Sequence, residues 1–438
     1  MSKPKKRWII IFSILVGLQL ISLLTSSSTF SIEEAGTIDK ADTAWMIVAT
    51  AFVLFMTPGL SFFYGGMVGW RNVISTMLQS FIALGVVSLL WYLVGFSLAF
   101  GESYHGLIGN PLTYFSFNNV GLATNPDFSP TIPFLIFALF QLKFAIITPA
   151  LITGSFAERV KFTSYLLFMV LFSLLIYCPL AHWTWHPEGF LRKWGVLDFA
   201  GGTVVHMSAG FAALAGAFVL GKRQNNNHQP ANIPFIILGT GMLWFGWFGF
   251  NAGSALAANG LAVQAFATTN MASASAMLTW VLFDALVGRR ISATGACIGA
   301  VVGLVAITPA AGFVSISQSV FIGFAAALVS NLAVYYKNRT SLDDTLDVFP
   351  CHGVGGIVGM ILTAVFAKDV GAIYGDFTTL QYHLLALVIV GIFTFGGTWV
   401  IYKAVGSITR LRVSREEELL GLDISQHAET MEAKSAMG

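Results

Sequence analysis

The stretch DFAGGTVVHMSAGFAALAGAFVL, residues 198–220, decides the fold of this sequence, because it places His206 inside an apolar run. A second stretch, FPCHGVGGIVG at residues 349–359, does the same for His352, and the two runs are expected to enter a membrane from opposite sides. At 1.5 Å per helical residue, both imidazoles lie roughly 9 to 14 Å from the start of their runs, within a hydrocarbon layer about 30 Å thick. Ionisable groups at that depth mark functional sites. The two rings are therefore predicted to meet near the midplane.

Composition also indicates a membrane protein. Of the 438 residues, 56% are hydrophobic and only 10% are charged, and the mean hydropathy is +0.76. An aqueous globule does not tolerate such values. Long unbroken apolar runs favour a bundle of helices in the lipid bilayer over a β-barrel. The formal net charge of +2 gives no indication of a nucleic-acid partner. An all-α membrane protein is predicted.

Eleven transmembrane helices are predicted after a leader. Residues 1–28 have a basic start, an apolar run and a polar exit, which is the profile of a signal peptide. No A-x-A triplet marks the cleavage site, so an uncleaved anchor stays open. The transmembrane domain is expected over residues 29–405 and a cytoplasmic tail over 406–438. The eleven expected spans are 43–65, 74–100, 131–153, 162–181, 199–220, 233–252, 262–287, 291–309, 314–336, 347–366 and 381–405.

Positive charges give the expected orientation. If the span after the leader runs from outside to inside, the loops obey the positive-inside rule. The mature N-terminus is then outside the plasma (inner cell) membrane and the tail is in the cytoplasm. The outer basic residues are Lys40, Arg192, Lys193 and Lys368. The inner ones are Arg71, Arg159, Lys161, Lys222, Arg223, Arg289, Arg290, Lys337, Arg339, Lys403, Arg410, Arg412, Arg415 and Lys434.

The two histidines lie on helices five spans apart, and the number of spans is odd. Spans one to five and six to ten therefore form two blocks of opposite orientation. This inverted repeat is typical of transporters, which place their site between the repeats. Sequence similarity between the halves is limited to a histidine near a Gly-Gly pair and an upstream aspartate, Asp198 in one half and Asp347 in the other.

His206 and His352 allow two interpretations. Each could be a core histidine bonded to a backbone carbonyl, or the two could pair with each other. Pairing is favoured, because an unpaired imidazole in lipid is costly. Neutral imidazole has one donor and one acceptor, so two rings can share a proton. No metal site is predicted, since neither the neighbouring Cys351 nor any carboxylate completes a ligand set.

Three further features have both a structural and a functional interpretation. Asp198 is expected to cap the helix that follows it, and its carboxylate would also favour a cation near the entrance. Phe140 and Phe144 lie one helical turn apart, and a group of ring faces can bind a small cation. Lys143 lies between them, deep in a span, where it either snorkels to the surface or takes part in the vestibule.

Four segments together resemble the Amt/MEP/Rh ammonium transporter family, specifically its bacterial Amt members. They are FAIITPALITGSFAERV (144–160), DFAGGTVVHMSAGFAALAGA (198–217), GWFGFNAGSALAANGLA (246–262) and FPCHGVGGIVG (349–359). The motifs occur in the family's order, and the resemblance covers nearly the whole chain after the leader. It implies a homotrimer of eleven-helix protomers, each with its own narrow hydrophobic pore. No cofactor is expected, and no nucleophile with an adjacent base indicates an enzyme.

The resemblance also implies roles for individual residues. The outer ammonium recruitment site would comprise Phe144, Trp185 and Ser254, with Phe140, Tyr177 and the family's essential aspartate, Asp198, nearby. The pore gate would be the stacked Phe144 and Phe250, together with Trp247. His206 and His352 match the family's twin histidines. At Lys143 the chain departs from the family pattern of a small or apolar residue, and a fixed positive charge beside the gate would oppose a cation.

The resemblance implies an ammonium transporter or channel that recruits ammonium, removes a proton and conducts ammonia, with a proton relay along the histidines left open. The segment RLRVSREEELLGLDISQHAE (410–429) resembles the family's tail, which PII-type signal proteins bind, and retains Arg412, Glu417 and Asp423. One alternative is an ammonium sensor acting through such a partner, and another is an Rh-like neutral-gas channel. Retention of Trp185 and Ser254 argues for the Amt branch.

Overall fold

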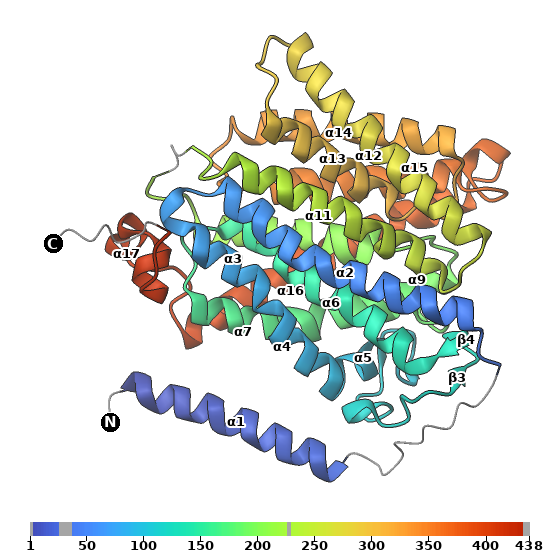
Figure 1. Cartoon of the computed structure of the whole chain (residues 1–438), viewed down its shortest axis with the longest axis horizontal. Coiled ribbons are helices and arrows are strands. Elements are labelled where there is room, and N and C mark those ends of the chain that lie inside the picture. The colour runs from blue at the N-terminus through green and yellow to red at the C-terminus, as the bar shows by residue number, and fades with distance from the viewer. Residues whose placement is uncertain (1–2, 26–36, 226–228, 432–438) are drawn as a thin grey trace.

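The structure, a computed structural model, describes residues 3–25, 37–225 and 229–431. The helices form one elongated bundle, with two small hairpins at one end (Figure 1). Within the described residues, nine helical segments have the length and hydropathy needed to cross a membrane. They are Lys40–Met67, Trp70–Phe100, Phe134–Phe156, Phe162–Lys193, Gly202–Leu220, Ile233–Ala255, Ile316–Lys337, Phe349–Phe366 and Thr378–Ile408. The predicted all-α, multi-pass membrane architecture is confirmed.

Several of these segments consist of consecutive helices of different pitch. The α-helices are α1 (Lys3–Thr25), α2 (Lys40–Met67), α3 (Val73–Phe81), α4 (Ala83–Leu90), α5 (Phe96–Phe100), α6 (Phe134–Phe156), α7 (Phe162–Phe172), α8 (Cys178–Trp185), α9 (Phe190–Lys193), α10 (Ser208–Leu220), α11 (Ile233–Ala252), α12 (Gly260–Leu286), α13 (Ala293–Ile307), α14 (Ile316–Lys337), α15 (Gly355–Phe366), α16 (Thr378–Ile408) and α17 (Arg415–Leu420). The other helices are η1 (Trp70–Asn72), η2 (Trp91–Gly95), η3 (Phe115–Phe117), η4 (Ser173–Tyr177), η5 (Gly202–Met207), η6 (Gly253–Ala255), η7 (Phe349–Val354), η8 (Ala372–Tyr374) and η9 (Asp423–His427).

Two of the eleven expected spans are helices that do not reach the hydropathy or length of the nine. The helix α13 has 15 residues and is a shorter apolar helix, whereas a span takes about 20. The helix α12 has 27 residues but includes Gln264, Asn270 and Asp284. Figure 1 shows α1, the expected leader helix, beside the bundle. The expected leader boundary at residue 28 lies outside the described residues, as does the chain beyond residue 431 with Lys434.

The two ends of the bundle carry different elements (Figure 1). At the hairpin end, β1 (Ser103–Tyr104) pairs with β2 (Ile108–Gly109), and β3 (Thr124–Asn125) pairs with β4 (Ser129–Pro133), both antiparallel. The helix α17 lies at the opposite end, which we call the tail end. There the Asp423 carboxylate caps α3, because it accepts the backbone N–H groups of Ile74 at 3.1 Å and Ser75 at 2.7 Å. The tail is thus packed onto the bundle by specific hydrogen bonds.

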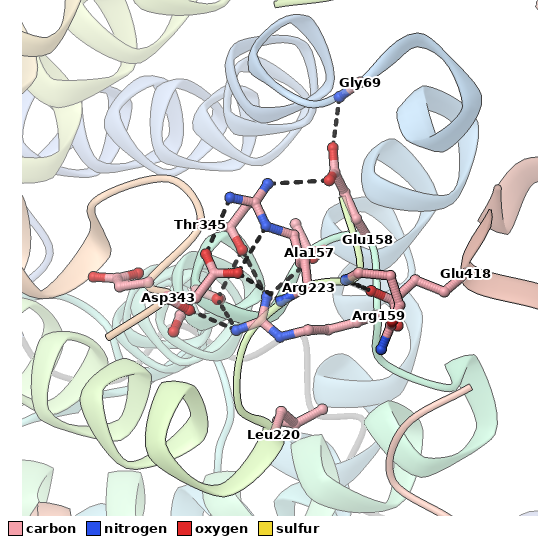
Figure 2. Close-up of polar contacts among 12 residues, drawn as sticks. Gly69, Ala157, Glu158, Arg159, Leu220, Arg223, Asp343, Thr345 and Glu418 are labelled. Atoms are coloured by element: carbon pink, nitrogen blue, oxygen red, sulfur yellow. Dashed lines mark hydrogen bonds and ion pairs between the residues drawn. The ribbon is translucent and has the colours of Figure 1, made fainter. Parts of the chain in front are cut away.

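Buried ion pairs join loops from both halves of the chain at the tail end. Arg223 donates to both carboxylate oxygens of Asp343 and to Glu158, each at 3.0 Å, as Figure 2 shows. Burial alone would raise the pKa of Asp343, but the hydrogen bonds from Arg223 and the charge of Arg159 hold that pKa below its ordinary value. Arg159 also donates to the Thr345 hydroxyl at 2.7 Å. These contacts fix the loop that leads into η7.

The helices that carry the two histidines cross in opposite directions. Residues near position 202 meet residue 356, His206 meets His352, and Phe211 meets Phe349 with ring centroids 5.5 Å apart. The two helices are therefore antiparallel where they cross. The crossing is close, because a Cβ atom on Gly210 would collide with the backbone of Gly353. Small residues allow such backbone approach between membrane helices.

Candidate functional site

A cavity of about 390 Å³ lies at the hairpin end and collects most of the expected recruitment residues. Phe144, Trp185, Ser254 and Asp198 all line it. On α6, the lining residues Phe137, Gln141 and Phe144 follow the i, i+4, i+7 spacing of one helical face. Phe140 lies behind this wall, fully buried, with its ring 4.9 Å from that of Phe144. Of the two phenylalanines that the sequence singled out on α6, Phe144 lines the cavity and Phe140 does not.

The wall of this cavity offers aromatic faces and a hydroxyl acceptor. The Phe144 and Trp185 rings are nearly perpendicular, with centroids 5.7 Å apart. The Ser254 hydroxyl donates to the Phe250 carbonyl at 2.8 Å, so only its lone pairs are available to a ligand. The Trp185 indole N–H donates to the Asp198 carbonyl at 3.2 Å, which fixes the ring. Such a wall suits a small cation with N–H donors.

Asp198 caps η5, as the sequence predicted. Its Oδ1 accepts the N–H groups of Gly201 at 2.7 Å and Gly202 at 2.6 Å. Its Oδ2 accepts the Thr203 N–H at 2.7 Å and the Thr203 hydroxyl at 2.5 Å. Both carboxylate oxygens are therefore used by the chain's own helix. Asp198 therefore contributes its negative charge to the cavity. Its carboxylate oxygens accept hydrogen bonds from the start of η5.

Besides Phe140, two further residues singled out from the sequence do not line the cavity. Tyr177 is fully buried, and its ring packs against Trp91 with centroids 6.3 Å apart. Lys143 is only partly buried. Because successive helical residues turn by about 100°, the side chain next to Phe144 leaves α6 on a different face. Neither Tyr177 nor Lys143 is among the described residues that line the cavity.

Two stacked phenylalanines separate the cavity from a narrow lumen. The Phe144 and Phe250 rings lie 4.1 Å apart between centroids at an angle of 29°. Phe144 lines the cavity on one side, and Phe250 lines a space of only about 10 Å³ on the other. That volume is close to the size of one water-sized molecule. Apart from the two histidines, the lumen is lined by apolar and aromatic side chains: Met56, Leu60, Phe63, Ile147, Leu151, Val205, Leu243, Trp247, Phe250 and Val301.

His206 and His352 meet in this lumen. Their Nδ1 atoms are 3.3 Å apart, their ring centroids 5.4 Å, and both side chains are buried. The interpretation of mutual pairing is confirmed over that of separate core histidines. Trp247 stacks on His206 with centroids 5.3 Å apart. Trp247 therefore lies beside the histidines, one layer beyond the Phe144–Phe250 pair.

Thr308 determines which nitrogen of His206 carries the proton. Its hydroxyl donates to the Leu304 carbonyl at 2.8 Å and accepts the Trp247 indole N–H at 2.9 Å. Its oxygen also lies 3.3 Å from Nε2 of His206 and can only accept there. These contacts assign the proton of neutral His206 to Nε2, so that its Nδ1 accepts a hydrogen bond from Nδ1 of His352.

The second half of the chain repeats the capping aspartate, but at Asp344 and not at Asp347. Asp344 accepts the Phe349 N–H at 2.7 Å at the start of η7. Like Asp198, it lies eight positions before its histidine. Asp347 was the wrong choice from the sequence, because it pairs with Lys337 at 2.6 Å. Burial raises the pKa of Asp344 to about 6, although the charge of Lys337 opposes this shift.

The chain is similar to known proteins in sequence and in fold. The model of the Ammonium Transporter Family matches residues 44–432. The chain is 44% identical over 415 residues to the ammonium transporter of Aquifex aeolicus, covering 93% of this chain and 97% of the relative. It is 43% identical over 397 residues to the ammonium transporter of Bacillus subtilis, covering 89% and 97%. The crystal structure of Mep2 from Saccharomyces cerevisiae superposes with a TM-score of 0.84 at 35% identity, covering 92% and 93%. The relatives are membrane transporters and not enzymes. With its paired histidines and aromatic entrance, the chain belongs to the ammonium transporter family.

Proposed function

We propose that this protein recruits ammonium in the cavity at the hairpin end, where the ion releases one proton to water on the cavity side of the Phe144–Phe250 pair, and that it conducts ammonia through the lumen. The observation that carries this proposal is the pair of unlike spaces on either side of the stacked rings. One is a cavity of about 390 Å³ lined in part by polar groups, and the other is an apolar lumen of about 10 Å³. A hydrated ion fits only the first.

Energetics favour the neutral species in the lumen. Removing a small ion from water costs of the order of 20 kcal/mol by an idealised Born estimate, and the lumen offers few polar atoms to offset it. Ammonia avoids most of this cost. The released proton either stays in the water outside the lumen or follows along the hydrogen-bonded imidazoles. Potassium has no proton to release, so this mechanism also excludes it.

The finer architecture belongs to the same proposal. We propose eleven transmembrane helices, with α12 and α13 as two of them, in an inverted five-helix repeat around the pore. The opposite directions of the two histidine helices support this repeat. Residues 1–28 would be the leader, 29–405 the transmembrane domain and 406–438 a cytoplasmic tail, with the hairpin end outside. A homotrimer and a PII-type partner at the tail follow from the family resemblance.

The transport step is tested with purified protein in proteoliposomes. An inward ammonium gradient is expected to produce uptake that empty vesicles lack. If the proton follows along the histidines, a current accompanies uptake and disappears in His206→Ala. Uptake without current would contradict the relay but not the transport of ammonia. Absence of ammonium uptake by folded wild-type protein would overturn the proposed function itself.

Thr308→Val is expected to lower the ammonium uptake rate by roughly tenfold or more, because two buried N–H groups lose their acceptor at about 1–3 kcal/mol each. The groups are Nε1 of Trp247 and Nε2 of His206. Valine keeps the shape of threonine but not its oxygen. The tautomer of His206 is then no longer fixed. Uptake per folded protein and the thermal unfolding midpoint measure the effect.

Thr308→Ser is the matched control, since it retains the hydroxyl. It is expected to stay close to the wild-type rate. Equal rates for the valine and serine variants would show that the hydroxyl does not determine the state of the histidine pair.

A further inference from the structure

Gln141 is a polar residue of the outer cavity to which the transport proposal assigns no role. It lies on the face of α6 that carries Phe137 and Phe144, one turn before Phe144, and it lines the cavity with Trp185 and Ser254. Its flanking residue Phe140 is fully buried behind the wall. An uncharged amide is therefore held among aromatic rings at the entrance to the stacked pair.

The amide of Gln141 has no hydrogen bond within the part of the chain that the structure describes. Its Oε1 is shielded and accepts nothing from those residues. A buried acceptor without a partner is costly, and most such groups in proteins find one. A half-turn of the amide exchanges oxygen and nitrogen, so the acceptor can face the cavity. The amide oxygen of Gln141 can then accept a hydrogen bond from a donor that enters the cavity.

Ammonium is such a donor, because it carries four N–H bonds and needs acceptors in place of water. Ser254 provides one oxygen, since its own proton is given to the Phe250 carbonyl. Asp198 is a poor direct ligand, because its two oxygens already accept four hydrogen bonds from its own helix. The aromatic rings attract the charge but accept no ordinary hydrogen bond. A second oxygen acceptor is missing from this set.

We infer that Gln141 supplies that acceptor, so that its amide oxygen binds ammonium directly in the outer cavity beside Phe144, Trp185 and Ser254. This inference rests on the proposed recruitment of ammonium at the hairpin end. Gln141 is then a substrate-binding residue that replaces part of the water lost by the ion. Gln141 lies on the cavity side of the stacked rings. It therefore affects the binding of ammonium and not passage through the lumen.

The test compares Gln141→Leu with Gln141→Glu in proteoliposomes, with ammonium uptake measured over a range of concentrations. Leucine removes the acceptor, and the half-saturating concentration is expected to rise by about tenfold or more, since a hydrogen bond to a charged group is worth about 1.5–3 kcal/mol. The maximal rate is expected to stay within about twofold of wild type, because an interaction of recruitment alone changes half-saturation and not the rate. Glutamate keeps an acceptor and adds a charge, so its half-saturating concentration is expected to fall below that of wild type and to rise with salt.

Gln264→Leu is the matched control. Gln264 is also partly buried, but its amide donates to the Val314 carbonyl at 2.6 Å, and it does not line the cavity. Its half-saturating concentration is expected to equal that of wild type.

The opposite directions of the leucine and glutamate effects distinguish binding from structural support. An unchanged half-saturating concentration in folded Gln141→Leu, or the same rise in both Gln141 variants, would overturn the inference. In either case wild-type uptake would still stand, so the proposed function would not be affected. Failure of the wild type to take up ammonium would be a failure of that function instead.

Discussion

Replacement of Asp198 by alanine is expected to abolish ammonium uptake and to reduce sharply the yield of folded protein. The carboxylate accepts four hydrogen bonds of 2.5–2.7 Å at the start of η5. Each buried donor left without an acceptor costs about 1–3 kcal/mol, and a protein is stable by only about 5–15 kcal/mol. The helix start that carries His206 then loses its anchor, and the negative charge near the cavity disappears with it.

Asp198→Asn separates the cap from the charge. The asparagine oxygen can still accept from Gly201 and Gly202, but its NH₂ group faces the N–H and hydroxyl donors of Thr203. We expect partial folding and an uptake rate per folded protein reduced by about tenfold or more, in line with loss of charge-assisted bonds worth about 1.5–3 kcal/mol each. Yield is measured by size-exclusion chromatography and rate by vesicle uptake.

Asp284→Asn serves as the control, because Asp284 is a buried carboxylate on α12 that pairs with Arg289 and Asn331. It is expected to affect stability without a specific loss of uptake per folded protein. Wild-type uptake by a well-folded Asp198→Ala variant would show that the cap and its charge are dispensable.

The sequence predicted the elements of the fold whose signals are local. Apolar runs predicted the helices, and the depth of His206 and His352 in their runs predicted that the rings meet. Long-range geometry was harder to obtain. Asp347 is nearest to His352 among the candidate caps, yet its backbone is left-handed, with φ 57°, and its side chain pairs with Lys337. The sequence signal for Asp344 is its spacing, because Asp198 and Asp344 each lie eight residues before their histidine.

The site was predictable to the extent that one helix face determines it. Phe137, Gln141 and Phe144 have the spacing of a single face, which was visible in the sequence, although Gln141 was overlooked. Tyr177 lies eight residues before Trp185, which is about 12 Å along a helix, so the two side chains do not share a cavity. Thr308 gave no signal, because its role depends on contacts with Trp247 and His206 from two other helices.

Replacement of His352 or His206 by glutamate is expected to open a potassium leak. A carboxylate in the lumen attracts a cation at 4 Å by about 4 kcal/mol at an effective dielectric constant of 20. Water that accompanies a buried charge also makes the lumen wetter. These effects lower the barrier that the apolar lining imposes on an ion that cannot release a proton. Potassium conductance in proteoliposomes is expected to rise by about tenfold or more over wild type, since part of the attraction is lost to burying the carboxylate.

The neutral variant His352→Gln is the control that separates charge from size. Glutamine keeps a donor and an acceptor beside Nδ1 of His206 and adds no charge, so potassium is expected to stay excluded. Growth on limiting ammonium is measured in parallel. The same substitution is expected to cause the potassium leak and to remove the histidine from proton transfer. If both acidic variants exclude potassium as wild type does and support the same growth, the imidazoles are not the selectivity filter. Selectivity would then depend on the stacked Phe144 and Phe250 rings, whose centroids lie 4.1 Å apart.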